Sequence, residues 1–277
     1  GRAIWLTTSK DFETWTEPEL IFEADDLDQE LGKQRIEARL ADPTVQGHYS
    51  VEPDVYNVDV YHMIPFRYES VYLGMPAMYL AMGRNTINNT DGFHVVELIS
   101  SRNLKQWIRL GDRKPFIAPS KLGGGAYDLT QIMPPTSTVV RGDELWLYYT
   151  GLKYRGPVGP DFKGPKRDPD TSAICLAVLR RDGFISPDAT DAVGIVQTKS
   201  FSVPSGNLHV NVDAPDGELI VEALGSNGEV LTTSSPIKGN HPSAGVQLDK
   251  GNGLSKGTVA SLRFRMTNGS LYSYWFE

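Results

Sequence analysis

The chain has 277 residues, of which 40% are hydrophobic, and it carries a formal net charge of -7. This length can build one large or two medium domains with their own cores, and no apolar run is long enough to span a bilayer. The acidic balance argues against a nucleic-acid partner, because a phosphate backbone favours a basic surface. We therefore expect a globular protein with neither a nucleic-acid nor a membrane partner.

A short motif recurs along the chain. Residues 8–15 (TSKDFETW) return as residues 100–107 (SSRNLKQW), and a degenerate third copy follows at residues 180–184. Strands are predicted on either side of the first copy, at residues 2–9 and 15–23. Fixed internal repeats of this kind are typical of propellers and other repeat architectures.

The segment after the first copy departs from the strand pattern. Residues 27–40 have helical composition, with charges at helical spacing. We expect a short helix in a loop between repeats, and we favour a solvated segment over a functional lid.

One full repeat unit runs from about residue 54 to residue 117. Its apolar and β-branched runs, separated by Gly, Asn, Asp or Pro, predict four strands, at residues 58–63, 71–82, 93–100 and 107–117. Four antiparallel strands per repeat describe a propeller blade. The next unit starts at Tyr127, with strands predicted at residues 131–140, 144–151 and 172–185 and a candidate fourth at 194–203.

The first residues of the chain match only the last two strands of such a unit, so the sequence predicts about two and a half blades. Propellers close with four to eight blades, and an open ring would leave strand edges unpaired. Two explanations stay open: missing N-terminal blades in a longer gene product, or a homo-oligomer in which a second copy completes the ring. The first residue is Gly1 rather than Met, which fits a trimmed chain.

Beyond residue 188, strands arrive about every ten residues, with short turns at 215–217 and 226–228. Apolar and polar side chains alternate along them, as expected for a small antiparallel β-sandwich with one buried face per sheet. The fold class is therefore all-β, with a partial propeller domain at residues 1–195 and a β-sandwich domain at residues 196–277. The predicted sandwich strands are residues 207–213, 218–224, 229–233, 244–248, 258–266 and 271–276.

The repeat motif, the segment at residues 142–151 (GDELWLYYTG) and the Tyr127-Asp128 pair before a strand resemble five-bladed β-propeller glycoside hydrolases, families 32 and 43 and their relatives. The C-terminal strands are similar to the sandwich that closes many members of this group. The resemblance implies hydrolysis of O-glycosyl bonds by two carboxyl groups in a central funnel, and a carbohydrate ligand. It also implies that a first-blade nucleophile motif is absent from the chain, so we expect the chain to be inactive alone.

Within that group the catalytic carboxylates lie near the start of innermost strands, a place that Asp54 and Asp128 occupy in successive units. We expect these two aspartates to be the catalytic candidates, with Asp54 or Asp128 contributing one member of the carboxylate pair, although an aspartate at such a position also commonly caps a turn. Each is followed three residues later by an amide, Asn57 or Gln131, suited to bonding sugar hydroxyls. The tripeptide at residues 167–169 (RDP), which carries a catalytic-site aspartate in family 32, is interpreted as coincidence.

Three further residues are expected to contact the substrate: Asp59, which shares a strand face with the first amide, His62 and Tyr127. An interior histidine with satisfied hydrogen bonds is the competing interpretation for His62. No Cys/His cluster, phosphate-binding loop or dinucleotide fingerprint occurs, so neither a cofactor nor a metal is expected.

The sequence therefore predicts a glycoside hydrolase, with a non-catalytic carbohydrate-binding or scaffold module as the alternative. The sugar, the linkage and the stereochemical outcome stay open. So does the compartment, which can be periplasmic, secreted or cytoplasmic, because a single cysteine allows no disulfide within the chain and a signal peptide, if the gene encodes one, lies outside the given sequence.

Overall fold

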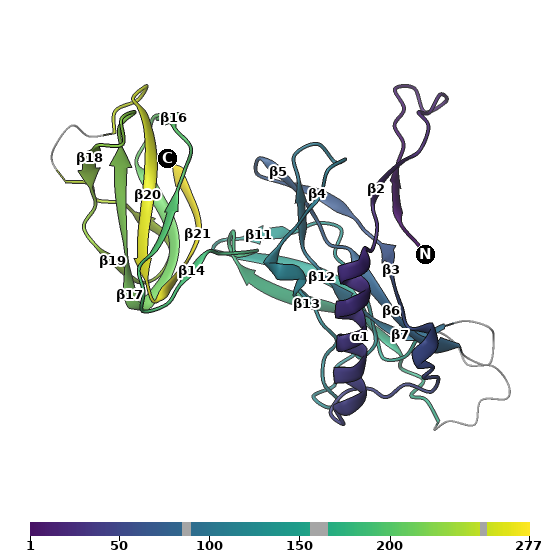
Figure 1. Cartoon of the computed structure of the whole chain (residues 1–277). Coiled ribbons are helices and arrows are strands. Elements are labelled where there is room, and N and C mark those ends of the chain that lie inside the picture. Colours follow the sequence, from purple (N-terminus) through teal and green to yellow (C-terminus); the bar gives the residue numbers. More distant parts are fainter. Residues whose placement is uncertain (85–89, 156–165, 250–253) are drawn as a thin grey trace. The chain divides into compact units, whose positions relative to one another are not determined.

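The computed structural model describes residues 1–84, 90–155, 166–249 and 254–277, which form two compact units (Figure 1). Unit 1 comprises Gly1–Val139 and Trp146–Val178, and unit 2 comprises Val140–Leu145 and Leu179–Glu277. Apart from one α-helix and two short 3-10 helices, the regular structure of the described residues is β-strand, so the all-β prediction is confirmed. None of the described helices is long and apolar enough to cross a membrane.

The chain begins with an antiparallel hairpin of β1 (Ile4–Leu6) and β2 (Glu19–Phe22). The repeated motif forms the turn of this hairpin. The hydroxyl of Ser9 accepts a hydrogen bond from the backbone N–H of Phe12 at 2.8 Å, and the carboxylate of Asp11 accepts those of Glu13 and Thr14. Short polar side chains that bond the backbone ahead of them favour turns over strands.

The second copy of the motif builds the same turn. Ser101 Oγ accepts from the backbone N–H of Leu104 at 2.9 Å, and Asn103 Oδ1 accepts from the next two N–H groups. The residue after the Asp or Asn is left-handed in both copies, with φ 63° at Phe12 and 64° at Leu104. The spacing of Ser and Asp or Asn therefore encodes one turn conformation.

The segment predicted as the first full blade is built of strands, but they form two sheets rather than one four-stranded sheet. The inner sheet has the order β3 (Asn57–His62), β6 (Ala77–Arg84), β7 (Thr90–Val96). The outer sheet has the order β4 (Pro65–Tyr68), β5 (Val71–Gly74), β8 (Ile99–Ser101), β9 (Ile108–Arg109). The predicted second and third strands are thus each divided, and Pro76, which lacks a backbone N–H, lies at the first division. A 3-10 helix, η2 (Gly111–Arg113), follows β9.

In the next unit, β12 (Glu144–Leu152) pairs with β10 (Gln131–Met133), β11 (Val139–Arg141) and β13 (Ser172–Arg180). Residues 131–140 were predicted as one strand. Pro134 and Pro135 interrupt it, because proline cannot donate to the ladder.

The helix α1 (Asp26–Ala41) lies in unit 1 between β2 and a short 3-10 helix, η1 (Pro53–Val55). Its first turn is closed by a capping box, in which Asp25 and Asp28 each accept the other's backbone N–H. Gln29 bonds both the N–H and the C=O of Val58 on β3, and Gly32 has no Cβ to meet the Val58 side chain. The helix is confirmed, but its inner face is packed against the blade rather than solvated.

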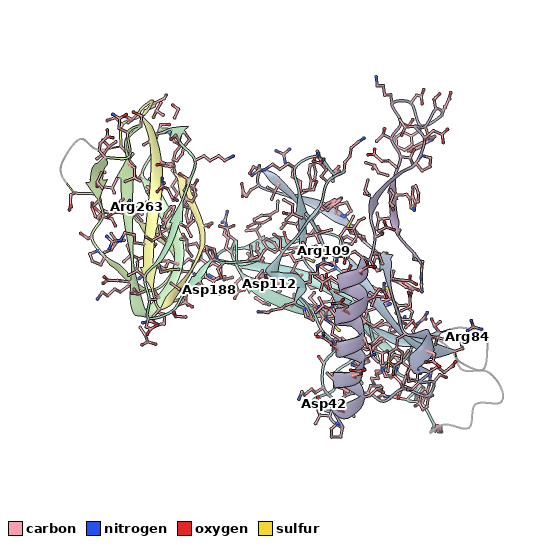
Figure 2. The ribbon with its side chains drawn as sticks, in the orientation of Figure 1. Asp42, Arg84, Arg109, Asp112, Asp188 and Arg263 are labelled. Atoms are coloured by element: carbon pink, nitrogen blue, oxygen red, sulfur yellow. The ribbon has the colours of Figure 1, made fainter. Side chains whose placement is uncertain are left out.

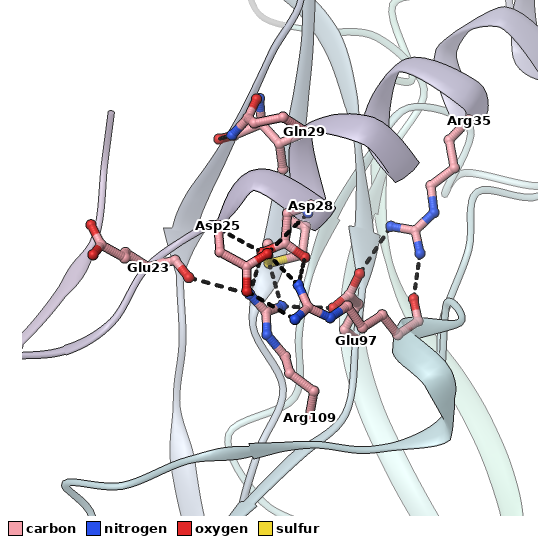
Figure 3. Close-up of polar contacts among 10 residues, drawn as sticks. Glu23, Asp25, Asp28, Gln29, Arg35, Glu97 and Arg109 are labelled. Carbon is pink, nitrogen blue, oxygen red and sulfur yellow. Dashed lines mark hydrogen bonds and ion pairs between the residues drawn. The ribbon is translucent and has the colours of Figure 1, made fainter.

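A buried ionic network fastens α1 to the outer sheet (Figure 3). The carboxylates of Asp28 and Glu97 are each only 1% exposed. Glu97 accepts from Arg35 at 2.9 Å and from Arg109 at 2.8 Å, while Asp28 accepts from Arg109 and, at 2.8 Å, from Arg113. Every carboxylate oxygen of this pair therefore has an arginine partner.

Unit 2 is built around one long strand, β17 (Leu208–Leu224), which changes partners along its length. Its first part pairs with β21 (Gly269–Phe276) and β19 (Ile237–Gly245), and its second part pairs with β20 (Val259–Thr267) and β18 (Val230–Thr233). Twelve buried apolar residues from these strands and from Val246 form its core.

The predicted turn at residues 215–217 is wrong, because β17 runs through it. The pairing of β17 with β19 shifts in register there, and Gly217 comes so close to the Thr267 carbonyl that a side chain would collide with it. The turn at residues 226–228 is confirmed, with Gly228 at φ 84°.

An ion pair joins two neighbouring strands of unit 2. On β20, Arg263 (Figure 2) bonds the Glu222 carboxylate of β17 at 2.5 Å.

The candidate fourth strand of the second blade also belongs to unit 2. Residues 194–203 contain β15 (Gly194–Gln197) and β16 (Phe201–Ser202), and both pair with β20. The neighbouring β14 (Asp188–Ala189) pairs with β21. This part of the chain was assigned to the blade because alternation alone does not say which sheet a strand joins.

Candidate functional site

Asp128, one of the two predicted catalytic aspartates, lies buried in the segment just before β10. It is 5% exposed, and its Oδ2 accepts a hydrogen bond from the Tyr149 hydroxyl on β12 at 2.8 Å. Burial and this bond raise the pKa of Tyr149 above its ordinary range, so the phenol remains the donor. Gly151 makes the position possible, because a Cβ there would lie 2.8 Å from the Asp128 backbone.

Asp54, the other predicted catalytic residue, has different surroundings. It is exposed on η1, in the turn that leads into β3. Among the described residues, no hydrogen bond or ion pair joins it to Asp128. The structure thus places both aspartates just before the first strand of their unit, as expected, and gives them unequal exposure.

Tyr127 is the centre of a second polar group. Its hydroxyl donates to Asp170, which raises the pKa of Tyr127, and the Lys153 ammonium lies 4.3 Å from the centre of its ring. Lys153 bonds Asp168 at 2.6 Å, and this bond lowers the pKa of Asp168. The tripeptide at residues 167–169 therefore lies in a loop that contacts a predicted site residue, although its sequence context gave no reason to expect this.

The remaining predicted residues stand on β3 and β10. Asp59 accepts the backbone N–H of Arg2 at 3.0 Å and its Nε at 3.4 Å, so this carboxylate already has a cationic partner. Asn57 is exposed at the first position of β3, whereas Gln131 on β10 is 4% exposed. His62 is partly buried, and burial lowers its pKa.

His94, which the sequence analysis did not single out, is fully buried beside Tyr61 and Tyr79. Its Nδ1 lies 3.2 Å from the carbonyl oxygen of Ile132, and desolvation, the largest cause, brings the pKa of His94 down to about 3. The imidazole is therefore neutral at physiological pH. Nothing in its strand pattern distinguished it from a packing residue.

A small pocket lies in unit 1 between the loop after α1, the start of β7 and the loop after β12. It encloses about 10 Å³, and His48, Tyr49, Asp91, Tyr154, Arg155 and Arg167 are among its lining residues. Arg39 Nε donates to His48 Nε2 at 2.8 Å, so the ring proton is on Nδ1, which faces Asp91 Oδ1 at 3.0 Å. Burial opposes ionisation of Asp91, but His48 and backbone N–H groups outweigh it and lower the pKa of Asp91.

The pocket residues could not be found from the sequence because they come from segments far apart in the chain and share no motif. Within the described part of the chain, no group of three or more His, Cys, Asp or Glu side chains is arranged to hold a metal ion.

No protein-family model matches the chain, and no curated protein matches it in sequence. Among solved structures, it is similar to a glycoside hydrolase family 43 arabinoxylan arabinofuranohydrolase from Bacillus subtilis, solved in complex with cellotetraose, with a TM-score of 0.25 and 9% identity over 87% of this chain and 61% of that one. A second similar structure, named glycoside hydrolase, has a TM-score of 0.27 and 17% identity over 53% of this chain and 39% of that one.

Both structural neighbours are glycoside hydrolases, the group that the sequence resembles. The chain spans less than two thirds of the length of either neighbour. Both TM-scores are below 0.5, so the likeness says nothing about the activity of this chain.

Proposed function

We propose that this chain is a glycoside hydrolase of the propeller type, in which Asp128 supplies one of the two reacting carboxyl groups. The observation that carries the proposal is the partner of Asp128: the carboxylate is buried, yet it is bonded by the phenol of Tyr149 and by no Lys or Arg of the described residues. Such a carboxyl can exchange a proton without breaking an ion pair. The general acid of glycoside hydrolysis must be able to exchange a proton in this way.

Asp54 is the proposed second carboxyl group. It is exposed and precedes the first strand of its own unit, so solvent and substrate can reach it. For the sugar hydroxyls, Asn57 and Tyr127 are the more accessible of the proposed ligands, while Gln131 is buried and Asp59 is held by Arg2. His62 stays a proposed contact because it is only partly buried.

The test compares hydrolysis of a panel of aryl glycosides by the chain, or by its full-length gene product, with that of Asp128→Asn and Asp54→Asn. We expect kcat to fall by roughly 10²- to 10⁴-fold in each, the usual loss for a general acid or base. Asp216→Asn, at an exposed position on β17, is the matched control and retains the native rate. Native rates in both site variants would remove the assignment.

A non-catalytic carbohydrate-binding module is the second candidate. The unequal exposure of Asp54 and Asp128 favours it, because a working pair flanks one bond at about 5 to 9.5 Å. In that case a sugar binds with no turnover on any substrate of the panel, and both asparagine variants keep that binding.

A further inference from the structure

We propose that two copies of this chain associate head to tail, so that the β1–β2 hairpin of one copy covers the exposed face of β12 and β13 in the other. Unit 1 carries about two and a half blades, and two copies therefore bring the number to five, within the range of four to eight at which propellers close. The proposal concerns assembly and does not depend on the proposed activity.

The repeats of unit 1 stack in chain order. Phe22 of β2 packs with Leu80 of β6 and Phe93 of β7 in one core, so the hairpin covers one face of the first blade. Neighbouring residues of a strand point to opposite faces, and on the other face the hydroxyl of Tyr79 accepts a hydrogen bond from Arg155 of the second unit. The first blade is thereby covered on both sides, and β6 and β7 are buried along nearly their whole length.

The second blade has an apolar face that no described residue covers. The backbone bonds at the two ends of the β12–β13 pair place Leu176 opposite Tyr148. Ile174, Leu176 and Val178 alternate along β13 and share the face of Tyr148, and all four side chains are between 42% and 71% exposed. These four residues are the β13 face. A contiguous apolar patch of this kind marks an interaction surface.

The hairpin has a matching surface at the other end of the stack (Figure 1). Trp5 and Leu20 lie opposite each other in the β1–β2 register and are 59% and 39% exposed, whereas their neighbours Ile4 and Ile21 pack against the core of unit 1. Trp5 and Leu20 are the hairpin face, and they point away from the first blade. Among the described strands, β1 and β2 pair only with each other.

Charge favours contact between these two faces. The hairpin exposes four carboxylates, those of Asp11, Glu13, Glu17 and Glu19, while β13 contains no acidic residue and is followed by the exposed Arg181. Opposite charges around an apolar centre steer two surfaces together and fix their orientation. Because each copy has both faces, one dimer forms two equivalent contacts across a two-fold axis, and it closes rather than continuing into a filament.

Sedimentation velocity over a range of concentrations tests the assembly of the 277-residue chain, and we expect a dimer. Leu20→Glu in the hairpin face and Leu176→Glu in the β13 face each place a carboxylate in the apolar contact. Each should raise the dissociation constant of the dimer by about 10-fold or more. Ile195→Glu, at a position on β15 that is 61% exposed, is the matched control and should leave this constant unchanged.

A mixture of the two variants distinguishes a head-to-tail contact from one in which like faces meet. In the mixed dimer, the native β13 face of Leu20→Glu meets the native hairpin face of Leu176→Glu. We therefore expect the mixture to associate more tightly than either variant alone, and this recovery also shows that both variants are folded. Amide hydrogen exchange gives a second readout, because residues 4–6 and 172–178 should exchange more slowly in the dimer.

A chain that stays monomeric at every concentration would overturn the proposal and would leave the blades of a longer gene product as the cover of both faces. Dimers that survive both glutamate variants would also overturn it, as would an equal weakening by Ile195→Glu. No recovery in the mixture, with both variants folded by circular dichroism, would overturn the head-to-tail arrangement.

Discussion

Two groups of buried carboxylates in unit 1 differ in the chemistry of their partners. Beneath α1, Asp28 and Glu97 are bonded by arginines on every oxygen, whereas Asp128, just before β10, is bonded by the phenol of Tyr149. An arginine pair fixes a buried carboxylate in place, because loss of either partner leaves an uncompensated charge in the interior. A phenol carries no charge that would be left without a counter-charge. The kind of partner therefore distinguishes a buried carboxylate with a structural role from one that is available for chemistry.

Breaking the network beneath α1 should have the largest effect on stability. Arg109→Ala leaves Asp28 and Glu97 each short of one arginine in a buried site, and we expect the free energy of unfolding to fall by about 3–5 kcal/mol. Urea unfolding measures the loss. The control Arg102→Ala changes an exposed arginine, and its free energy of unfolding should remain within about 0.5 kcal/mol of that of the native chain. An equally small loss in Arg109→Ala would show that the network does not hold the helix.

At Asp128 the expected loss is smaller. Tyr149→Phe removes the donor to a buried carboxylate, which should lower the free energy of unfolding by about 1.5–3 kcal/mol. Tyr148→Phe, the exposed neighbour on β12, is the matched control. If both variants unfold at the same urea concentration as the native chain, Asp128 does not depend on this bond and the comparison loses its basis.

The smallest effect concerns pH. The bond from Arg113 is the largest cause that lowers the pKa of Asp25 from 3.8 to about 2. A carboxylate whose pKa is depressed by folding stabilises the fold above its unfolded pKa and loses that contribution as the pH falls from about 4 to about 2. Because the Asp25 side chain is 50% exposed, solvent screening keeps the contribution below about 1 kcal/mol.

Between pH 5 and pH 2, the free energy of unfolding should therefore fall less for Asp25→Asn than for the native chain. Urea unfolding at each pH measures it. Asp216→Asn, an exposed aspartate on β17, should follow the native profile. Identical pH profiles of the free energy of unfolding for all three proteins would show that Asp25 does not contribute to the loss of stability in acid.

Much of the fold could be predicted because its signals are local. The Ser9 and Ser101 turns, the helix at residues 26–41 and the left-handed Gly228 each depend on residues a few positions apart. Which sheet a strand joins is not local. The strand at residues 194–197 pairs with β20 although its alternation suited a blade equally well.

The candidate site divides in the same way. The order of Asp54 and Asp128 before their strands could be predicted from the repeat, but their exposure could not. Burial of Asp128 depends on the hydroxyl of Tyr149, 21 residues away, and on the missing side chain of Gly151. The RDP tripeptide was interpreted as coincidence because it follows a second strand rather than preceding a first. Its position along the chain does not show that its loop returns to Tyr127.

The amino-acid sequence alone determined the all-β class, the repeated turn and the capping box of α1, because short-range hydrogen bonds and side-chain alternation decide these features. Tertiary structure decided which buried carboxylates form ion pairs with arginine and which accept a hydrogen bond from a phenol. It also brought Arg155 and Arg167 into the same pocket as His48. Those outcomes depend on contacts between residues far apart in sequence, as between Arg109 and Asp28, at 81 positions, and no local pattern of residues specifies them.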